Sequence, residues 1–205
     1  MENILDEPHD YPLLVLASTS PRRQELIHTL QLPVEVEPSN EDETVDIHWA
    51  PYETVEQLAL RKANSVARAR RARGEGGLVI GADTIVVLRD TILGKPENEA
   101  DAFRMLSALQ NEVHEVYTGV AIIDALTGVE LVRHRKTAVW MRPLNPEQIT
   151  RYIASGEPMD KAGSYGIQGL GAALVDRIEG CYFNVVGLPI SLLADMLKVY
   201  GIEKP

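Results

Sequence analysis

The feature that most constrains this chain is the segment Leu78–Leu88, LVIGADTIVVL, which is almost entirely apolar. Because it is short and rich in valine and isoleucine, it predicts a buried strand rather than a helix. Asp83 is its only ionisable residue. A carboxylate in such a strand must be protonated, paired or bound to a cation, since burying an isolated charge is costly. The segment therefore predicts a sheet core that carries one chemically important acid.

Apolar and amphipathic segments alternate along the rest of the chain. Short apolar runs predict strands, and helical spacing between caps and glycines predicts helices. Strands are expected at 13–17, 113–123, 129–141 and 172–178, and helices at 22–30, 53–73, 97–110, 189–200 and between Asn145-Pro146 and Gly156. Residues 35–52 are expected to be irregular, and 89–91 to form a turn. One strand pair reads as a hairpin, so the chain predicts an α/β fold with a mixed sheet.

The charge balance weighs against nucleic-acid binding. The net charge is −10 and the sequence pI is near 5.0, whereas a nucleic-acid footprint needs a basic face that neutralises phosphates. The most basic run, 68–73, ends an expected helix, where cations complement the helix dipole. A small anionic ligand is compatible with this charge, because a few cations in one cleft can set the local potential.

Neither a membrane span nor an export signal is expected. No apolar run approaches the ~20 residues that cross a bilayer, and the acidic start MENILDEPHDYP lacks the pattern of a signal peptide. Cys181 is the single cysteine, which excludes an internal disulfide and fits a reducing compartment. We therefore expect a soluble, cytoplasmic protein.

The segment 16–23, LASTSPRR, has the features of a phosphate site at the start of a helix. Ser20 is a good N-cap and Pro21 suits the first helical position. The free N–H groups of that turn favour an anion. Ser18 adds a hydroxyl, and Arg22 and Arg23 add bidentate donors. The alternative is a capped helix with solvated arginines.

A lysine interrupts the apolar face of the long helix expected at 53–73. Lys62 falls on the stripe formed by Val55, Leu58, Ala59, Ala63 and Val66. A lysine that faces the core must reach solvent, pair with an acid or meet a ligand. The spacing alone leaves all three open.

Lys95 follows the buried strand on a constrained loop, Leu-Gly-Lys-Pro. One interpretation is a structural ion pair between Lys95 and Asp83. The other is catalytic use of Asp83, which is favoured because ligands gather at strand ends and switch points of such sheets. Gly81 leaves room for a close approach to the backbone.

A glycine-rich stretch, DKAGSYGIQGLG at 160–171, predicts tight backbone turns. Lys161 can hold a phosphate as a point charge. Gln168 offers an acceptor beside an amide donor, which matches the imide edge of uracil or thymine. Its amide could flip and pair with cytosine unless a neighbour fixes it. This stretch gains weight only beside the other sites.

Several cations with few carboxylates is the balance expected for a polyphosphate with one or two metal ions. Glycoside hydrolysis would need two opposed carboxylates, and serine hydrolysis a G-x-S-x-G elbow. The sequence has neither that elbow nor a Walker motif. Its histidines lack metal-ligand spacing such as H-E-x-x-H.

The order of several segments resembles that of Maf-like proteins. These segments are LASTSPRR, LRKA (60–63), GADTIVV (81–87), LGKP (93–96), HEVYTGVA (114–121), GEPMDKAGSYGIQG (156–169) and NVVGLP (184–189). The resemblance covers nearly the whole chain from residue 13. It implies a nucleoside-triphosphate pyrophosphatase with an elongated mixed sheet flanked by helices, similar to inosine-triphosphate pyrophosphatases, and a central cleft. Residues 13–205 would form a single Maf-like α/β domain with two lobes, preceded by a flexible extension, 1–12.

The resemblance also implies roles for individual residues. Asp83 looks like the catalytic acid. The phosphate and metal cluster would comprise Ser18, Arg22, Arg23, Glu43, Lys62, Lys95 and Lys161, with Asp83 and Glu43 as metal ligands. Arg22, Thr84 and Gln168 match specificity positions, and Gln168 resembles the subgroup that acts on dTTP and UTP. The stretch SNEDE around Glu43 departs from the usual I-D-E ending, and Gln110-Asn111 replaces the common Ser-Gly.

The expected reaction is attack of water on the α-phosphorus, with pyrophosphate as the leaving group. Mg²⁺ or Mn²⁺ would bridge phosphate oxygens, and Asp83 would hold that metal or accept the proton of water. The substrate is a nucleoside triphosphate, ordinary or modified, and a homodimer is compatible with the resemblance. The alternative is a nucleotide-binding regulator of cell division in which hydrolysis is incidental.

Overall fold

The long apolar segment is a strand, β3 (Leu78–Leu88), and it lies in the middle of a mixed sheet. The computed structural model of the protein describes residues 12–39, 41 and 49–203. Within these residues seven strands form the order β2-β1-β3-β5-β6-β7, with β4 also paired to β3. β1 is parallel to β2 and β3, and the other pairs are antiparallel. The remaining strands are β1 (Leu14–Leu16), β2 (Val34–Val36), β4 (Thr91–Leu93), β5 (Val113–Asp124), β6 (Glu130–Met141) and β7 (Val175–Glu179).

The helices begin where the sequence offers caps. Ser20 caps α1 by accepting a hydrogen bond from the Arg23 amide, and Asn145 forms a capping box with Gln148 at the start of α4. Gly74 ends α2 in the left-handed conformation. The α-helices are α1 (Pro21–His28), α2 (Pro51–Arg73), α3 (Glu99–Leu109), α4 (Pro146–Ala154), α5 (Tyr182–Val186) and α6 (Ile190–Leu197). Short 3₁₀ turns η1 (Glu157–Asp160), η2 (Ala162–Ser164), η3 (Gly169–Leu174) and η4 (Lys198–Tyr200) complete the described chain.

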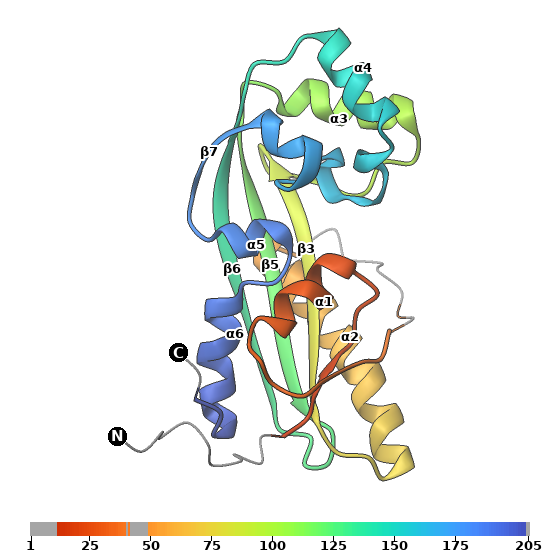
Figure 1. The fold of residues 1–205 in the computed structure, drawn as a ribbon, viewed down its shortest axis with the longest axis vertical. Helices are drawn as coiled ribbons and strands as arrows, with labels where there is room; N and C mark the ends of the chain where they lie inside the picture. Colours follow the sequence, from red (N-terminus) through yellow and green to blue (C-terminus); the bar gives the residue numbers. More distant parts are fainter. Residues whose placement is uncertain (1–11, 40, 42–48, 204–205) are drawn as a thin grey trace, which may run out of the picture.

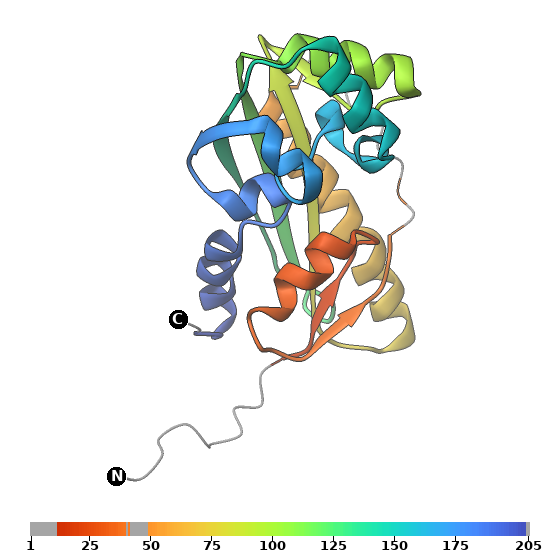
Figure 2. The same cartoon turned by 45° about the horizontal axis from the view of Figure 1, so that its top comes forward.

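The molecule is elongated because β3, β5 and β6 run along its length (Figure 1). One hydrophobic cluster joins β1, α1 and α6 to the first part of β3, and we call this half the lower lobe. A second cluster joins α3 and α4 to the last part of β3, and we call this half the upper lobe. Figure 2 shows the two groups of helices at opposite ends of the long strands. Asp83 and Thr84 lie on β3 between the residues that belong to these clusters.

Helix α2 packs unusually close to the sheet. A Cβ on Gly81 of β3 would lie 2.2 Å from the Ala59 carbonyl oxygen, and a Cβ on Gly119 of β5 would lie 2.2 Å from the Val55 carbonyl oxygen. Only glycine permits this approach, so the two glycines define where α2 sits. The stripe predicted from Val55 to Val66 is buried.

Several local expectations were wrong. Residues 35 and 36, part of the stretch expected to be irregular, belong to β2, and α2 begins at Pro51 rather than Glu53. Thr91, expected in a turn, begins β4. Both strands are too short to show a period. β2 pairs with β1 on the other side of α1, and β4 folds back on the end of β3 in a tight hairpin. The sequence also missed α5 and the 3₁₀ turns, and β7 begins three residues later than expected, at Val175.

Three expectations concern the chain as a whole. None of the described helices is both long enough and apolar enough to cross a membrane. The expected extension, 1–12, lies outside the described residues except for Pro12. Cys181 is a free thiol, as a single cysteine requires.

Candidate active site between the two lobes

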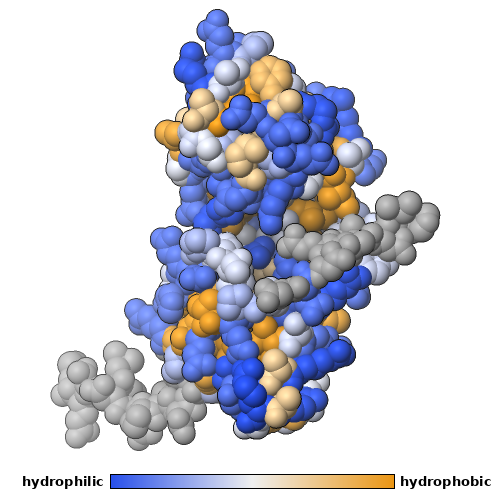
Figure 3. Space-filling view, turned by 90° about the vertical axis from the view of Figure 1, so that its right-hand side faces the viewer, coloured by the Kyte–Doolittle hydropathy of each residue, from blue (hydrophilic) through white to orange (hydrophobic). Residues whose placement is uncertain are grey.

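A cleft of about 530 Å³ opens beside β3 where the two lobes meet. β1 pairs with β3 over Leu78–Ile80 and β4 pairs with it over Val86–Leu88. Between these, no described strand covers this edge at residues 81–85, while β5 covers the other edge. Figure 3 shows hydrophilic side chains around the narrow middle of the molecule. The cleft has the volume typical of small-molecule sites.

The cleft brings together every predicted site residue that the structure describes. Its lining includes Ser18, Arg22, Arg23, Lys62, Asp83, Thr84, Lys95, Lys161 and Gln168. These come from α1, α2, β3 and three loops that are far apart in the sequence. Glu43, the remaining predicted residue, lies outside the described part of the chain.

Asp83 forms an ion pair with Lys62. The Lys62 ammonium lies 2.5 Å from Oδ1 of Asp83, and the two side chains are only 12% and 10% exposed. Lys62 projects from α2 because its neighbours on the stripe are buried against the sheet. Of the three outcomes open for a core-facing lysine, pairing with an acid is therefore the one observed. The desolvation cost of a buried pair offsets much of its attraction, so this pair is weak evidence for a role in stability.

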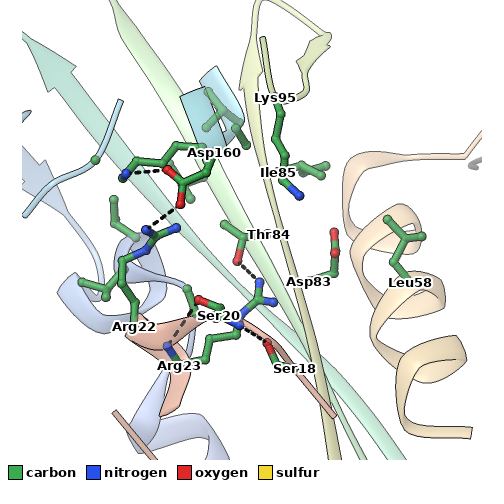
Figure 4. Close-up of a pocket in the computed structure, with 18 of the residues that line it drawn as sticks. Ser18, Ser20, Arg22, Arg23, Leu58, Asp83, Thr84, Ile85, Lys95 and Asp160 are labelled. Atoms are coloured by element: carbon green, nitrogen blue, oxygen red, sulfur yellow. Dashed lines mark hydrogen bonds and ion pairs between the residues drawn. The ribbon is translucent and has the colours of Figure 1, made fainter. Parts of the chain in front are cut away.

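The start of α1 presents its two arginines to the cleft. Arg23 donates from Nε to the Gly187 carbonyl oxygen at 2.8 Å and from Nη2 to the Thr84 hydroxyl at 3.0 Å. Arg22 donates to the Asp160 carboxylate at 3.4 Å (Figure 4). Both side chains therefore have partners across the cleft, and Ser20 caps the helix that carries them. Ser18 accepts a hydrogen bond from the Ser20 amide.

The upper lobe contributes two lysines. Lys95 extends from the loop after β4 into the cleft, toward Asp83 (Figure 4). Lys161 donates to the Glu157 carbonyl oxygen at 2.6 Å and to the Asp160 carboxylate at 2.7 Å. Burial alone would raise the pKa of Asp160, but Lys161 and Arg22 outweigh it and hold that pKa below its usual value.

The arrangement matches a known family. The model of the Maf-like protein family matches residues 13–200. The chain belongs to this family. A dTTP/UTP pyrophosphatase of Desulforamulus reducens is 54% identical over 190 residues, covering 93% of this chain and 97% of the relative. One of Moorella thermoacetica is 53% identical over 190 residues, covering 93% and 96%.

The fold of this Maf-like protein is also similar to a solved structure. The Ham1 protein of Staphylococcus aureus aligns with a TM-score of 0.50 at 14% identity, covering 92% of this chain and 99% of that one. At that identity the likeness concerns the fold alone. The expected fold class, a mixed sheet flanked by helices and similar to inosine-triphosphate pyrophosphatases, is confirmed.

Some polar residues of this Maf-like site escaped the sequence reasoning. Asp160 lines the cleft and bridges Arg22 and Lys161. Asn184 is fully buried, and its backbone oxygen accepts a hydrogen bond from the Thr118 hydroxyl, which lies 2.9 Å from that of Thr84. Both stand in segments that carry the resemblance, and that placement was the only available signal.

A buried histidine supports the wall of the cleft in the upper lobe. His114 Nε2 lies 2.6 Å from the hydroxyl of Tyr165, which lines the cleft. Burial lowers the pKa of His114 to about 4, so the ring is neutral at neutral pH. A neutral ring therefore contacts Tyr165, which belongs to the loop between Lys161 and Gln168.

Proposed function

We propose that the protein hydrolyses dTTP and UTP, and modified pyrimidine triphosphates of the same shape, to the monophosphate and pyrophosphate. The observation that carries this proposal is one cleft lined by Arg22, Arg23, Lys62, Lys95 and Lys161 around the carboxylate of Asp83. Five cations suit a triphosphate, whose charge increases on the leaving group during hydrolysis. Relatives that share about half of the sequence and nearly its full length are named for this reaction.

In the proposed mechanism, Asp83 is the catalytic carboxylate. Water attacks the α-phosphorus, a new P–O bond forms, and the bond to the bridging oxygen of the β-phosphate breaks. The leaving pyrophosphate keeps that electron pair, and the proton of water leaves through a carboxylate or solvent. Lys62, at 2.5 Å, is the counter-ion of Asp83. The ionised form is needed whether Asp83 accepts the proton or binds a metal.

A divalent metal, Mg²⁺ or Mn²⁺, fits the residues of the cleft. Oxygen ligands suit both ions, and Mg²⁺ is usually bound through one or two carboxylates together with substrate phosphates. Asp83 has one carboxylate oxygen outside the contact with Lys62, and Glu41 and Asp160 also line the cleft. When bound, the metal would neutralise phosphate charge. Asp83 would hold it, and Glu43 stays a proposed second ligand.

Gln168 is the proposed reader of the base. Its amide offers a donor beside an acceptor, complementary to the imide edge shared by uracil and thymine. Arg22 and Thr84 are proposed to act with it in specificity. Thr84 has a fixed orientation, since its hydroxyl contacts both Arg23 and Thr118.

The proposal extends to organisation and surroundings. We propose a single domain over 13–205 whose two lobes border the cleft, working in the cytoplasm, where free nucleotides would reach it. A homodimer is the assembly we propose to test first. Light scattering of the purified protein distinguishes dimer from monomer, and a monomeric mass would contradict the dimer.

The decisive experiment is a panel of triphosphates with Mg²⁺ or Mn²⁺, in which pyrophosphate is distinguished from orthophosphate. We expect repeated turnover of dTTP and UTP with pyrophosphate as product. Tight binding without product would favour a nucleotide-binding regulator instead.

The Asp83→Asn variant tests the catalytic acid. It is nearly isosteric and should abolish hydrolysis while the circular dichroism of the fold persists. Turnover close to that of the unsubstituted protein would remove Asp83 from its role.

A further inference from the structure

The loop that carries Lys161 and Gln168 has little regular structure of its own. It contains left-handed residues at Gly163, Ser164 and Gly169. Its conformation therefore depends on contacts with the rest of the upper lobe. Among the described residues, the Glu157 carboxylate and the Tyr152 phenol supply several of those contacts.

Glu157 holds the loop on the far side of Gln168. Its Oε2 accepts a hydrogen bond from the Leu170 amide and its Oε1 from the Gly171 amide, both at 2.9 Å. Its backbone oxygen accepts from the Lys161 ammonium at 2.6 Å. One residue thus contacts the proposed phosphate lysine and the backbone that follows the proposed base reader.

Tyr152 holds the loop on the near side of Gln168. Its hydroxyl donates to Oε1 of Glu157 at 2.9 Å and accepts from the Gly166 amide at 3.2 Å. Tyr152 is only 5% exposed, so its ring is fixed in the core of the upper lobe. The two side chains therefore fix the backbone two residues before Gln168 and two residues after it.

The packing leaves this part of the loop little room to shift. A Cβ on Gly171 would lie 2.2 Å from the Gly166 carbonyl oxygen and 2.6 Å from the Tyr152 hydroxyl. Burial alone would raise the pKa of Glu157, but the Gly171 and Leu170 amides and the Tyr152 hydroxyl outweigh it and lower that pKa. Glu157 is therefore ionised at neutral pH and accepts from all three donors.

We propose that Glu157 and Tyr152 are positioning residues that hold Gln168 at its place in the cleft and thereby set the base preference of the enzyme. The inference rests on the proposed function, in which Gln168 reads uracil or thymine. An amide can present its donor and acceptor either way round. Holding the backbone on both sides of Gln168 does not itself orient this amide, but it keeps the amide at one place in the cleft, where the edge of uracil or thymine would meet it.

Two substitutions test the pair. Glu157→Gln replaces one oxygen by an NH₂ group, which cannot accept from a loop amide. Tyr152→Phe keeps the ring but leaves the Gly166 amide without its acceptor. Each change removes hydrogen bonds that are worth roughly a factor of ten in the equilibrium between the held and the displaced loop. We therefore expect each variant to raise KM for UTP about tenfold. We also expect the UTP-to-CTP ratio of kcat/KM to fall about tenfold. The kcat for UTP should change far less, since Asp83 and Lys62 are untouched.

Asp124→Ala is the matched control. Asp124 also accepts hydrogen bonds from two backbone amides, those of Leu126 and Thr127, but in the β5–β6 turn at the end of the lower lobe. Removing its carboxylate leaves both amides without this acceptor, so the variant should lose stability comparably and keep the UTP-to-CTP ratio of the unsubstituted protein. A general loss of folding would lower activity on all substrates together, whereas the positioning role changes their ratio.

The outcomes are distinct. The inference is overturned if folded Tyr152→Phe keeps the original ratio and KM, and this variant decides alone should Glu157→Gln fail to fold. Binding of UTP and CTP is measured in parallel by calorimetry. If the unsubstituted protein binds UTP but releases no pyrophosphate, the proposed function fails, while the binding ratio still tests Glu157 and Tyr152.

Discussion

Because α2 packs so close to the sheet, we predict that Gly81→Ala will disturb the active site by changing the position of α2 relative to β3. The added Cβ would lie 2.2 Å from the Ala59 carbonyl oxygen and 2.8 Å from the Ala63 amide nitrogen. Side-chain Cβ atoms essentially never approach closer than 3.0 Å, so α2 and β3 must move apart by at least 0.8 Å, the difference between 3.0 and 2.2 Å. Lys62 lies on this turn of α2, and its 2.5 Å contact with Asp83 would lengthen with it.

Two magnitudes follow from that displacement. Overpacking of a core typically lowers the free energy of unfolding by about 1–3 kcal/mol. A misplacement of about 1 Å in a catalytic constellation can lower the rate about 100-fold. We therefore expect Gly81→Ala to remain folded and to lose far more of its kcat/KM than its modest loss of stability would cause. Urea unfolding and dTTP turnover measure the two quantities.

Gly76→Ala is the control for this prediction. A Cβ on Gly76 meets only the exposed side chain of Leu126, at 3.2 Å, and that side chain can move aside. Its stability and kcat/KM should stay near those of the unsubstituted protein. The reasoning is refuted if Gly81→Ala, though destabilised, hydrolyses dTTP as fast as Gly76→Ala.

Three further predictions concern polar groups around the cleft. His114 has a pKa of about 4 when folded, against about 6.5 when unfolded, so the unfolded state binds more protons between these pH values. The free energy of unfolding should therefore fall by roughly 3 kcal/mol as the pH drops from 6.5 to 4. Urea titrations should show a flatter pH dependence for His114→Gln. Gln168→Ala should lower the UTP-to-CTP ratio of kcat/KM more than it lowers kcat, and an unchanged ratio in steady-state assays would contradict base reading. Thr118→Val removes the hydroxyl between Thr84 and the Asn184 carbonyl, so the free energy of unfolding should fall by about 1–3 kcal/mol. KM for dTTP should also rise if Thr84 orients Arg23.

The chemistry of β3 could be predicted from the sequence because burial and charge conflict there. A single acid in an apolar strand and a single lysine on an apolar helix face each demand a partner. The identity of that partner could not be predicted. Lys95, seven residues after the strand, was considered as a structural ion-pair partner of Asp83. The observed ion pair with Lys62 depends on how α2 packs over Gly81.

The supports of the loop around Gln168 were less accessible to sequence reasoning. The acceptor role of Glu157 arises only when a 3₁₀ turn brings it against amides 13 and 14 residues later. No local period or cap encodes such a contact. The short strand β2 was missed for the same reason, because pairing with β1, which lies before α1 in the chain, defines it.

The ion pairs of the cleft differ in how readily a charged ligand could replace them. The contact of Arg22 with Asp160 is 3.4 Å long, with side chains 31% and 65% exposed, and such exposed pairs contribute only about 0–1 kcal/mol. The Lys62–Asp83 pair is buried, and breaking it would leave an uncompensated charge. An incoming phosphate can therefore take Arg22 from Asp160 at little cost but cannot readily separate Lys62 from Asp83. The same energetics that make one contact exchangeable keep the proposed catalytic carboxylate in place while the ligand binds.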